Sequence, residues 1–197
     1  MNYKDRCINA VKKTKEFGLE IDQSPIPFSK PISNSKRQKI LFNSAWALES
    51  IGYLTSFDLA QKCIPVHLML NQFLKKELGV VSYITIGDRF WSNSEIYCEM
   101  SYENIQKELN TPQINSPLNA HIWLTLSDGS ILDCTSEAHL DVLENRGIHA
   151  TNQCLTYIEA NSKQNVLSGY HRPYLFGSDF LIKTGAAPAV LCKPANL

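Results

Sequence analysis

Residues 121–135 contain the pattern that most constrains how this chain can fold. Two runs with high strand propensity, 121–126 and 130–135, are separated by Asp128 and Gly129, which favour a turn. This pattern predicts a β-hairpin. Because successive side chains of a strand point to opposite faces, the length of the turn decides which side chains of the two strands share a face.

Two turn lengths are compatible with the sequence, and they differ in where His121 and Asp133 lie. A two-residue loop would pair Leu124 with Asp133 and would put His121 and Asp133 on opposite faces. A three-residue loop at 127–129 would pair Trp123 with Asp133, so that His121 and Asp133 become diagonal neighbours on one face. The longer loop is favoured because it also gives the opposite face a mostly apolar surface. That surface consists of Ile122, Leu124, Leu126, Leu132 and Cys134.

Upstream of the hairpin, Cys63 is predicted to lie at the N-terminus of a helix. Pro65 is typical of a first helical turn, where its missing N–H costs no hydrogen bond, and Gly79 is typical of a helix end. The apolar residues between them recur at helical spacing and should face the core. They are Val66, Met69, Leu70, Phe73, Leu74 and Leu78.

The remaining patterns place most helices before the strands, which predicts an α+β protein. Helices are expected at 3–17, 36–54, 55–62, 138–145 and 178–184, strands at 80–86, 95–100, 121–126, 130–135 and 153–159, and a loop or extended arm at the proline-containing stretch 23–36. The length of 197 residues favours a single domain, 1–197. Within it we expect a helix and proline-rich arm at 1–35 and a C-terminal extension of the sheet at 137–197.

Cys63, His121 and Asp133 are the residues best suited to covalent chemistry. A thiol becomes a nucleophile near neutral pH when its thiolate is stabilised, and a helix N-terminus supplies partial positive charge and backbone N–H groups. An imidazole can take the thiol proton, and a carboxylate can orient the imidazole. His67, one helical turn after Cys63, is an alternative partner for the thiolate. Otherwise it should be a partly exposed helix residue.

The segment 58–136 resembles the transglutaminase-like branch of the papain-like cysteine enzymes. Cys63 precedes an amphipathic helix and a strand, and is followed by a His-Ile-Trp string that begins at His121 and an Asp-Cys-Thr string that begins at Asp133. These strings are similar to those of the superfamily and come in the same order. The resemblance implies a papain-like α+β fold, in which a central helix bearing the cysteine packs on an antiparallel sheet. It also implies a Cys-His-Asp catalytic triad, with 55–136 as the catalytic core.

The resemblance further implies how such a site would act. Cys63 would attack a carbonyl carbon to give a thioester, which water or an amine would resolve. The oxyanion would be held by the Cys63 backbone N–H and by a second donor, for which Gln61 and the Trp91 indole are the candidates. Trp123 would line the pocket.

The sequence departs from the family pattern on both sides of the nucleophile. Gln61 and Lys62 stand where a glycine commonly precedes the cysteine, and His67 stands where a small residue is common four positions later. These departures imply a differently shaped pocket beside Cys63. The substrate of the family is therefore not carried over to this chain.

Three classes of function follow from these residues. The first is a cysteine-dependent amide hydrolase, either a peptidase or a glutamine amidase or deamidase, acting on a protein, a peptide or another amide. The second is an acyltransferase, of transglutaminase-like or arylamine-acetyltransferase-like chemistry, that uses the same three residues. The third is a catalytically silent binding module, in which Cys63 would be an ordinary thiol.

Charge and composition exclude several other classes. The 19 basic and 19 acidic residues cancel, so no broad positive field exists to attract nucleic acid or an anionic membrane. No apolar run is long enough for a signal peptide or a membrane span, which favours a cytoplasmic protein or one exported without a Sec signal.

The six cysteines show neither a C-x-x-C pair nor the spacing of a disulfide framework. Cys98, His121, Cys134 and His139 do not fit the spacing of a closed zinc site, so we expect no metal. The Gly87-Asp88 and Gly177-Ser178 pairs are typical of turns and not of phosphate loops, so we expect no nucleotide cofactor.

Overall fold

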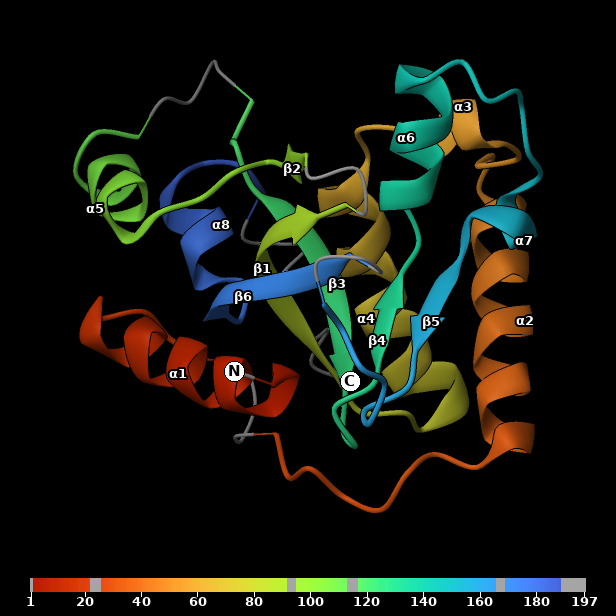
Figure 1. The fold of residues 1–197 in the computed structure, drawn as a ribbon, viewed down its shortest axis with the longest axis horizontal. Coiled ribbons are helices and arrows are strands. Elements are labelled where there is room, and N and C mark those ends of the chain that lie inside the picture. The colour runs from red at the N-terminus through yellow and green to blue at the C-terminus, as the bar shows by residue number, and fades with distance from the viewer. Residues whose placement is uncertain (1, 22–25, 92–94, 113–116, 166–168, 189–197) are drawn as a thin grey trace. The chain divides into compact units, whose positions relative to one another are not determined.

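The structure is a computed structural model that describes residues 2–21, 26–91, 95–112, 117–165 and 169–188 (Figure 1). The chain divides into two compact units, each built from separate stretches of sequence. Unit 1 comprises Met1–Pro25, Tyr83–Ile122 and Ser162–Leu197, and unit 2 comprises Ile26–Ser82 and Trp123–Asn161. Part of the proline-containing arm and the last residues, with Cys192, lie outside the described residues.

Each unit contains both helices and strands. Unit 1 holds α1 (Tyr3–Glu16), α5 (Tyr102–Asn110), α8 (Asp179–Lys183), all but the first residue of β1 (Ser82–Phe90), β2 (Ile96–Tyr97) and β6 (Tyr170–Phe176). Unit 2 holds α2 (Asn34–Ser50), α3 (Ser56–Leu59), α4 (Cys63–Leu78), α6 (Ser136–Leu143), α7 (Thr151–Cys154), β4 (Ile131–Asp133) and β5 (Thr156–Ile158). β3 (His121–Leu126) begins in unit 1 and continues into unit 2.

The strands belong to an antiparallel six-stranded sheet with the order β2-β1-β3-β4-β5, and β6 pairs with β1. Together with the helices, this sheet makes the protein α+β, as the order of the sequence patterns predicts. Among the described residues, no helix is both long and apolar enough to cross a membrane.

In unit 1, α1 packs along β6 (Figure 1). The backbone N–H of Phe176 donates to the hydroxyl of the buried Thr14 over 2.9 Å, and the Arg6 guanidinium donates to the carbonyl of His171 over 3.1 Å. Arg172 of β6 forms a two-pronged ion pair with the buried carboxylate of Asp88, with both N···O distances at 2.6 Å. The bonds of Thr14 and Arg6 tie the first helix to a strand from the far end of the sequence, and the ion pair ties that strand to β1.

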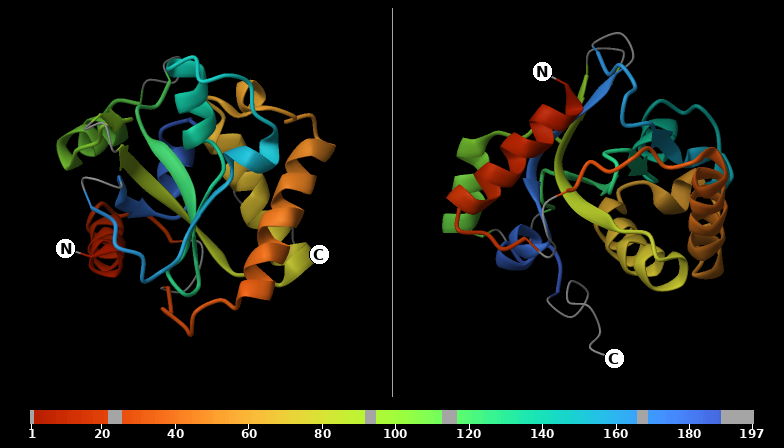
Figure 2. Two further views of the ribbon diagram at one scale, coloured as in Figure 1. Left: turned by 45° about the vertical axis from the view of Figure 1, so that its right-hand side comes forward. Right: turned by 90° about the horizontal axis from the view of Figure 1, so that it is seen from below.

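In unit 2, α2 and α4 lie side by side (Figure 2). The predicted stripe of α4 is buried in part: Val66, Leu70 and Leu74 are buried, whereas Met69, Phe73 and Leu78 are half-buried. The helix ends at Gly79, which has the left-handed φ of 58° that glycine tolerates and donates its N–H to the carbonyl of Leu74. Both ends of this helix therefore agree with the sequence prediction.

The β3–β4 hairpin has the three-residue loop. Leu124 pairs with Leu132, the N–H of Leu126 donates to the carbonyl of Ser130 over 2.8 Å, and Gly129 has a φ of 91°. Continuing this register by one residue puts Trp123 opposite Asp133. The side-chain alternation then places His121 and Asp133 on one face of the hairpin, and the two-residue loop is excluded.

Several predicted elements are wrong in extent or type. The strand expected at 95–100 is only Ile96–Tyr97, and the strand expected at 153–159 begins with the last residues of α7. Neither α5 nor β6 was predicted. Pro173 interrupts the strand pattern of β6, but in the structure it pairs with Gly87 next to a register shift, where a missing N–H is tolerated. The helix expected at 36–54 ends at Ser50, and Ile51, which follows the last helical turn, is 57% exposed.

Candidate functional site

Cys63 is the first residue of α4, a helix of 16 residues. The residue is 7% exposed, so it is nearly buried. The partial positive charge and the backbone N–H groups of a helix N-terminus stabilise an anion at this position. Gln61, two residues earlier, has a φ of 61°, which is a strained conformation for a residue other than glycine and sets the path of the chain into the helix.

His67 is fully buried, so the expectation that it is partly exposed is wrong. Its Nδ1 lies 2.8 Å from the carbonyl oxygen of Cys63, and the backbone N–H of Cys134 donates to its Nε2 over 3.0 Å. Both ring nitrogens therefore have backbone partners. This arrangement disfavours His67 as the base for the Cys63 thiol, since accepting a proton would break one of these bonds.

Asp133 is the last residue of β4, and its side chain is fully buried. It accepts hydrogen bonds from the backbone N–H of Thr135 at 3.1 Å, from the backbone N–H of Ser136 at 3.2 Å and from the hydroxyl of Ser136 at 2.6 Å. Such donors stabilise a charged carboxylate and fix its orientation. Ser136 was not predicted from the sequence, although a serine three residues after an aspartate is a common partner in a turn.

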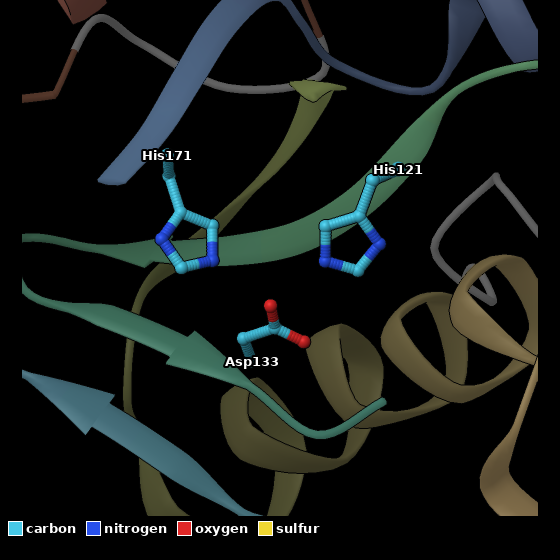
Figure 3. A group of neighbouring side chains, drawn as sticks. All are labelled: His121, Asp133 and His171. Atoms are coloured by element: carbon cyan, nitrogen blue, oxygen red, sulfur yellow. The ribbon is translucent and has the colours of Figure 1, made fainter. Parts of the chain in front are cut away.

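His121 lies in a row of aromatic rings within unit 1. Its ring centroid is 5.0 Å from that of Tyr97, and Tyr97 stacks on the buried Trp91 at 5.1 Å. The ring centroid of His171, on β6, is 6.2 Å from that of His121 (Figure 3). Trp91 is thus separated from His121 by the ring of Tyr97.

The other predicted pocket residues lie in different surroundings. Trp123 is fully buried and follows His121 by two residues on β3, so it shares the face of His121. Gln61 is exposed, at the entrance to α4.

Figure 3 shows His121 and His171, which both belong to unit 1 and are fully buried. Imidazoles are ligands that zinc and iron accept in catalytic sites. These two histidines could therefore supply ligands to a divalent metal ion, and His171 was not predicted from the sequence.

His171 was missed because β6 was missed. The signal that could have found it is the alternation of 170–175, in which His171 and Leu175 are buried and Tyr170, Arg172 and Tyr174 are half-buried. Pro173 masked this alternation in the sequence.

Four other cysteines have thiols with raised pKa values, chiefly because they are buried. Burial raises the pKa of Cys7 to about 12, that of Cys98 to about 11 and that of Cys154 to about 11. It also raises the pKa of Cys134 well above the ordinary value, and the neighbouring Asp133 adds to this shift. None of the four has the environment of a reactive thiol.

Comparison of the chain with protein-family models, with curated proteins and with solved structures gave no significant match. The case for a function therefore depends on the residues and their geometry.

Proposed function

We propose that this chain is a cysteine-dependent amide hydrolase similar to the transglutaminase-like enzymes, with Cys63 as nucleophile, His121 as base and Asp133 as the group that orients the imidazole. The observation that carries the proposal is the register of the β3–β4 hairpin. The other register would separate His121 from Asp133, whereas this one gives them a common face. The position of Cys63 at the start of α4 adds the second element of support.

In the proposed reaction, His121 takes the thiol proton of Cys63, and the thiolate sulfur attacks the carbonyl carbon of an amide. The C–N bond then breaks, the amine leaves with the proton from His121, and a thioester remains on Cys63. Water attacks the thioester, gives its proton to His121, and releases the carboxylic acid and the free thiol. The three hydrogen bonds to Asp133 fix the orientation of its carboxylate, which would stabilise the imidazolium formed in the first step.

The backbone N–H groups of a first helical turn point along the helix axis toward its N-terminus, and that of Cys63, the first residue of α4, would stabilise the oxyanion. Gln61 and Trp91 remain the candidates for the second donor. Gln61→Ala and Trp91→Phe each remove one of these donors without adding a charge. Turnover should fall about 100-fold in the variant that lacks the donor in use and should change little in the other.

The test is alkylation by iodoacetamide, mapped by peptide mass spectrometry in the native protein, in His121→Ala and in Asp133→Asn. Cys63 is the readout, and Cys7, Cys98 and Cys154 are internal controls. Rapid reaction of Cys63 alone below pH 7, lost in both variants, is the expected result. If Cys63 reacts no faster than the controls, the hydrolase proposal fails and the binding module takes its place.

The products then separate hydrolysis from acyl transfer. The protein is incubated with glutamine-containing peptides, with and without a labelled primary amine, and Cys63→Ser is the control. Release of ammonia and free acid supports hydrolysis, and incorporation of the amine supports transfer. The assay is repeated with EDTA, because an activity that the chelator abolishes would favour metal chemistry at His121 and His171.

A further inference from the structure

His67 joins two parts of the proposed site within unit 2. It lies on α4 one turn after Cys63, and its imidazole reaches from that turn to the segment that follows Asp133. Its side chain has no exposed surface. A buried polar group of this kind is retained only when its hydrogen bonds are made, and here both ring nitrogens bond to backbone atoms.

The two bonds fix the tautomer of His67. A backbone N–H can only donate, so the bond from Cys134 requires a lone pair on Nε2. The proton of the neutral ring is then on Nδ1, which donates it to the carbonyl oxygen of Cys63. The imidazole therefore acts as a rigid, uncharged bridge with one donor and one acceptor.

Each end of this bridge is attached to a predicted catalytic group. The carbonyl at one end belongs to Cys63 itself. The N–H at the other end belongs to Cys134, the residue that follows Asp133. The next two residues, Thr135 and Ser136, donate their backbone N–H groups to the Asp133 carboxylate. An oxygen of that carboxylate also lies 3.9 Å from Nε2 of His67. A shift of His67 would change the position of the nucleophile relative to the aspartate that orients its base.

We propose that His67 is a positioning residue, which holds the first turn of α4 in register with the end of β4 so that Cys63 is correctly placed for reaction. This inference rests on the function proposed above and adds a residue that the Cys-His-Asp assignment does not contain. Misplacement of a reacting group by about 1 Å can lower a rate about 100-fold, so a bridge of this kind has a large effect without touching the substrate.

The experiment measures the pH profile of Cys63 alkylation by iodoacetamide in the full chain and in three variants. His67→Leu removes both bonds and keeps an apolar side chain of similar size. His67→Asn keeps a donor near the Nδ1 position and loses the acceptor, and His67→Gln can place an amide oxygen near the Nε2 position. Leu74→Ala is the matched control, because it weakens a buried position of the same helix that bonds neither Cys63 nor Cys134.

We expect His67→Leu, which loses both bonds, to lower the rate of Cys63 alkylation below pH 7 at least about tenfold and to move the midpoint of the pH profile upward. His67→Asn and His67→Gln, which each keep one bond, should lower the rate less. Leu74→Ala should lower the melting temperature and leave the midpoint in place. Circular dichroism establishes that each variant is folded. If His67→Leu does not fold, the profile of His67→Asn decides whether His67 positions Cys63.

Two results would overturn the inference in different ways. If Cys63 of the native protein is reactive and a folded His67→Leu or His67→Asn has an unchanged profile, His67 has no positioning role, and the proposed hydrolase survives. If Cys63 of the native protein reacts no faster than Cys98, the proposed function itself fails, and the inference fails with it.

Discussion

At the residue scale, burial determines how reactive the thiol of Cys98 should be. Burial raises the pKa of Cys98 to about 11, although the residue is partly exposed. Only the thiolate reacts with iodoacetamide, and its fraction grows as pH rises toward the pKa. The rate of Cys98 alkylation should therefore rise about tenfold per pH unit between pH 7 and pH 10. Peptide mass spectrometry over this range measures the rate, and a plateau below pH 9 would contradict the raised pKa.

The ion pair between Asp88 and Arg172 is a second feature at the residue scale, and its contribution to stability depends on its burial. Asp88 is fully buried, and Arg172 supplies both of its short side-chain bonds. Arg172→Met should lower the free energy of unfolding by about 3–5 kcal/mol, because it leaves a buried carboxylate without its cation. The double variant Arg172→Met/Asp88→Leu should lose less than the single variant, since no unpaired charge remains. Urea unfolding measures both variants, and a loss in the double variant as large as that in Arg172→Met would contradict the prediction.

At the scale of elements, the hairpin loop is held by Gly129. The φ of 91° is costly for any other residue, and a Cβ at this position would meet the ring of Phe28 at 3.1 Å. Gly129→Ala should therefore lower the free energy of unfolding by about 1–3 kcal/mol from the backbone alone, with a further loss from the contact with Phe28.

Gly52→Ala is the matched control for this loop. Gly52 has a similar φ of 96°, but its Cβ would have nothing within 4 Å. The difference between the two variants in urea unfolding thus measures the contact with Phe28. Equal losses in the free energy of unfolding would mean that the Phe28 ring moves aside freely. The loss in Gly129→Ala would then come from the backbone conformation alone.

The elements also differ in how well the sequence predicts them. The bounds of α4 and the register of β3–β4 follow from local signals, namely Pro65, Gly79 and the turn before Ser130. β6 was missed because its pairing with β1 joins residues at least 80 positions apart, and a proline at a register shift looks locally like the end of a strand.

At the scale of the whole molecule, neither unit is a continuous piece of sequence. α1 packs on β6, so the first helix depends on the last strand. Deletion of residues 162–197 should therefore remove the protection of α1 amides against hydrogen exchange, since the deletion removes the Phe176 N–H and the His171 carbonyl that α1 side chains bond.

The control for this deletion is α2, whose packing partners α4 and α7 are retained. Its amides should keep more of their protection than those of α1, as measured by mass spectrometry in the same sample. Equal loss in both helices would mean that the two units unfold as one, and full protection of α1 would mean that β6 is not what orders it.

The sequence by itself determined what depends on neighbours in the chain. The α+β class, the place of Cys63 at a helix N-terminus and the common face of His121 and Asp133 all follow from periodicity and turn chemistry over short stretches. Only the tertiary structure decided the burial of His67, because its partner Cys134 is 67 residues away, and the approach of His171 to His121. A polar side chain on a helix is as easily exposed as buried, and the hydrogen-bond partner that permits burial comes from a distant segment that local patterns do not specify.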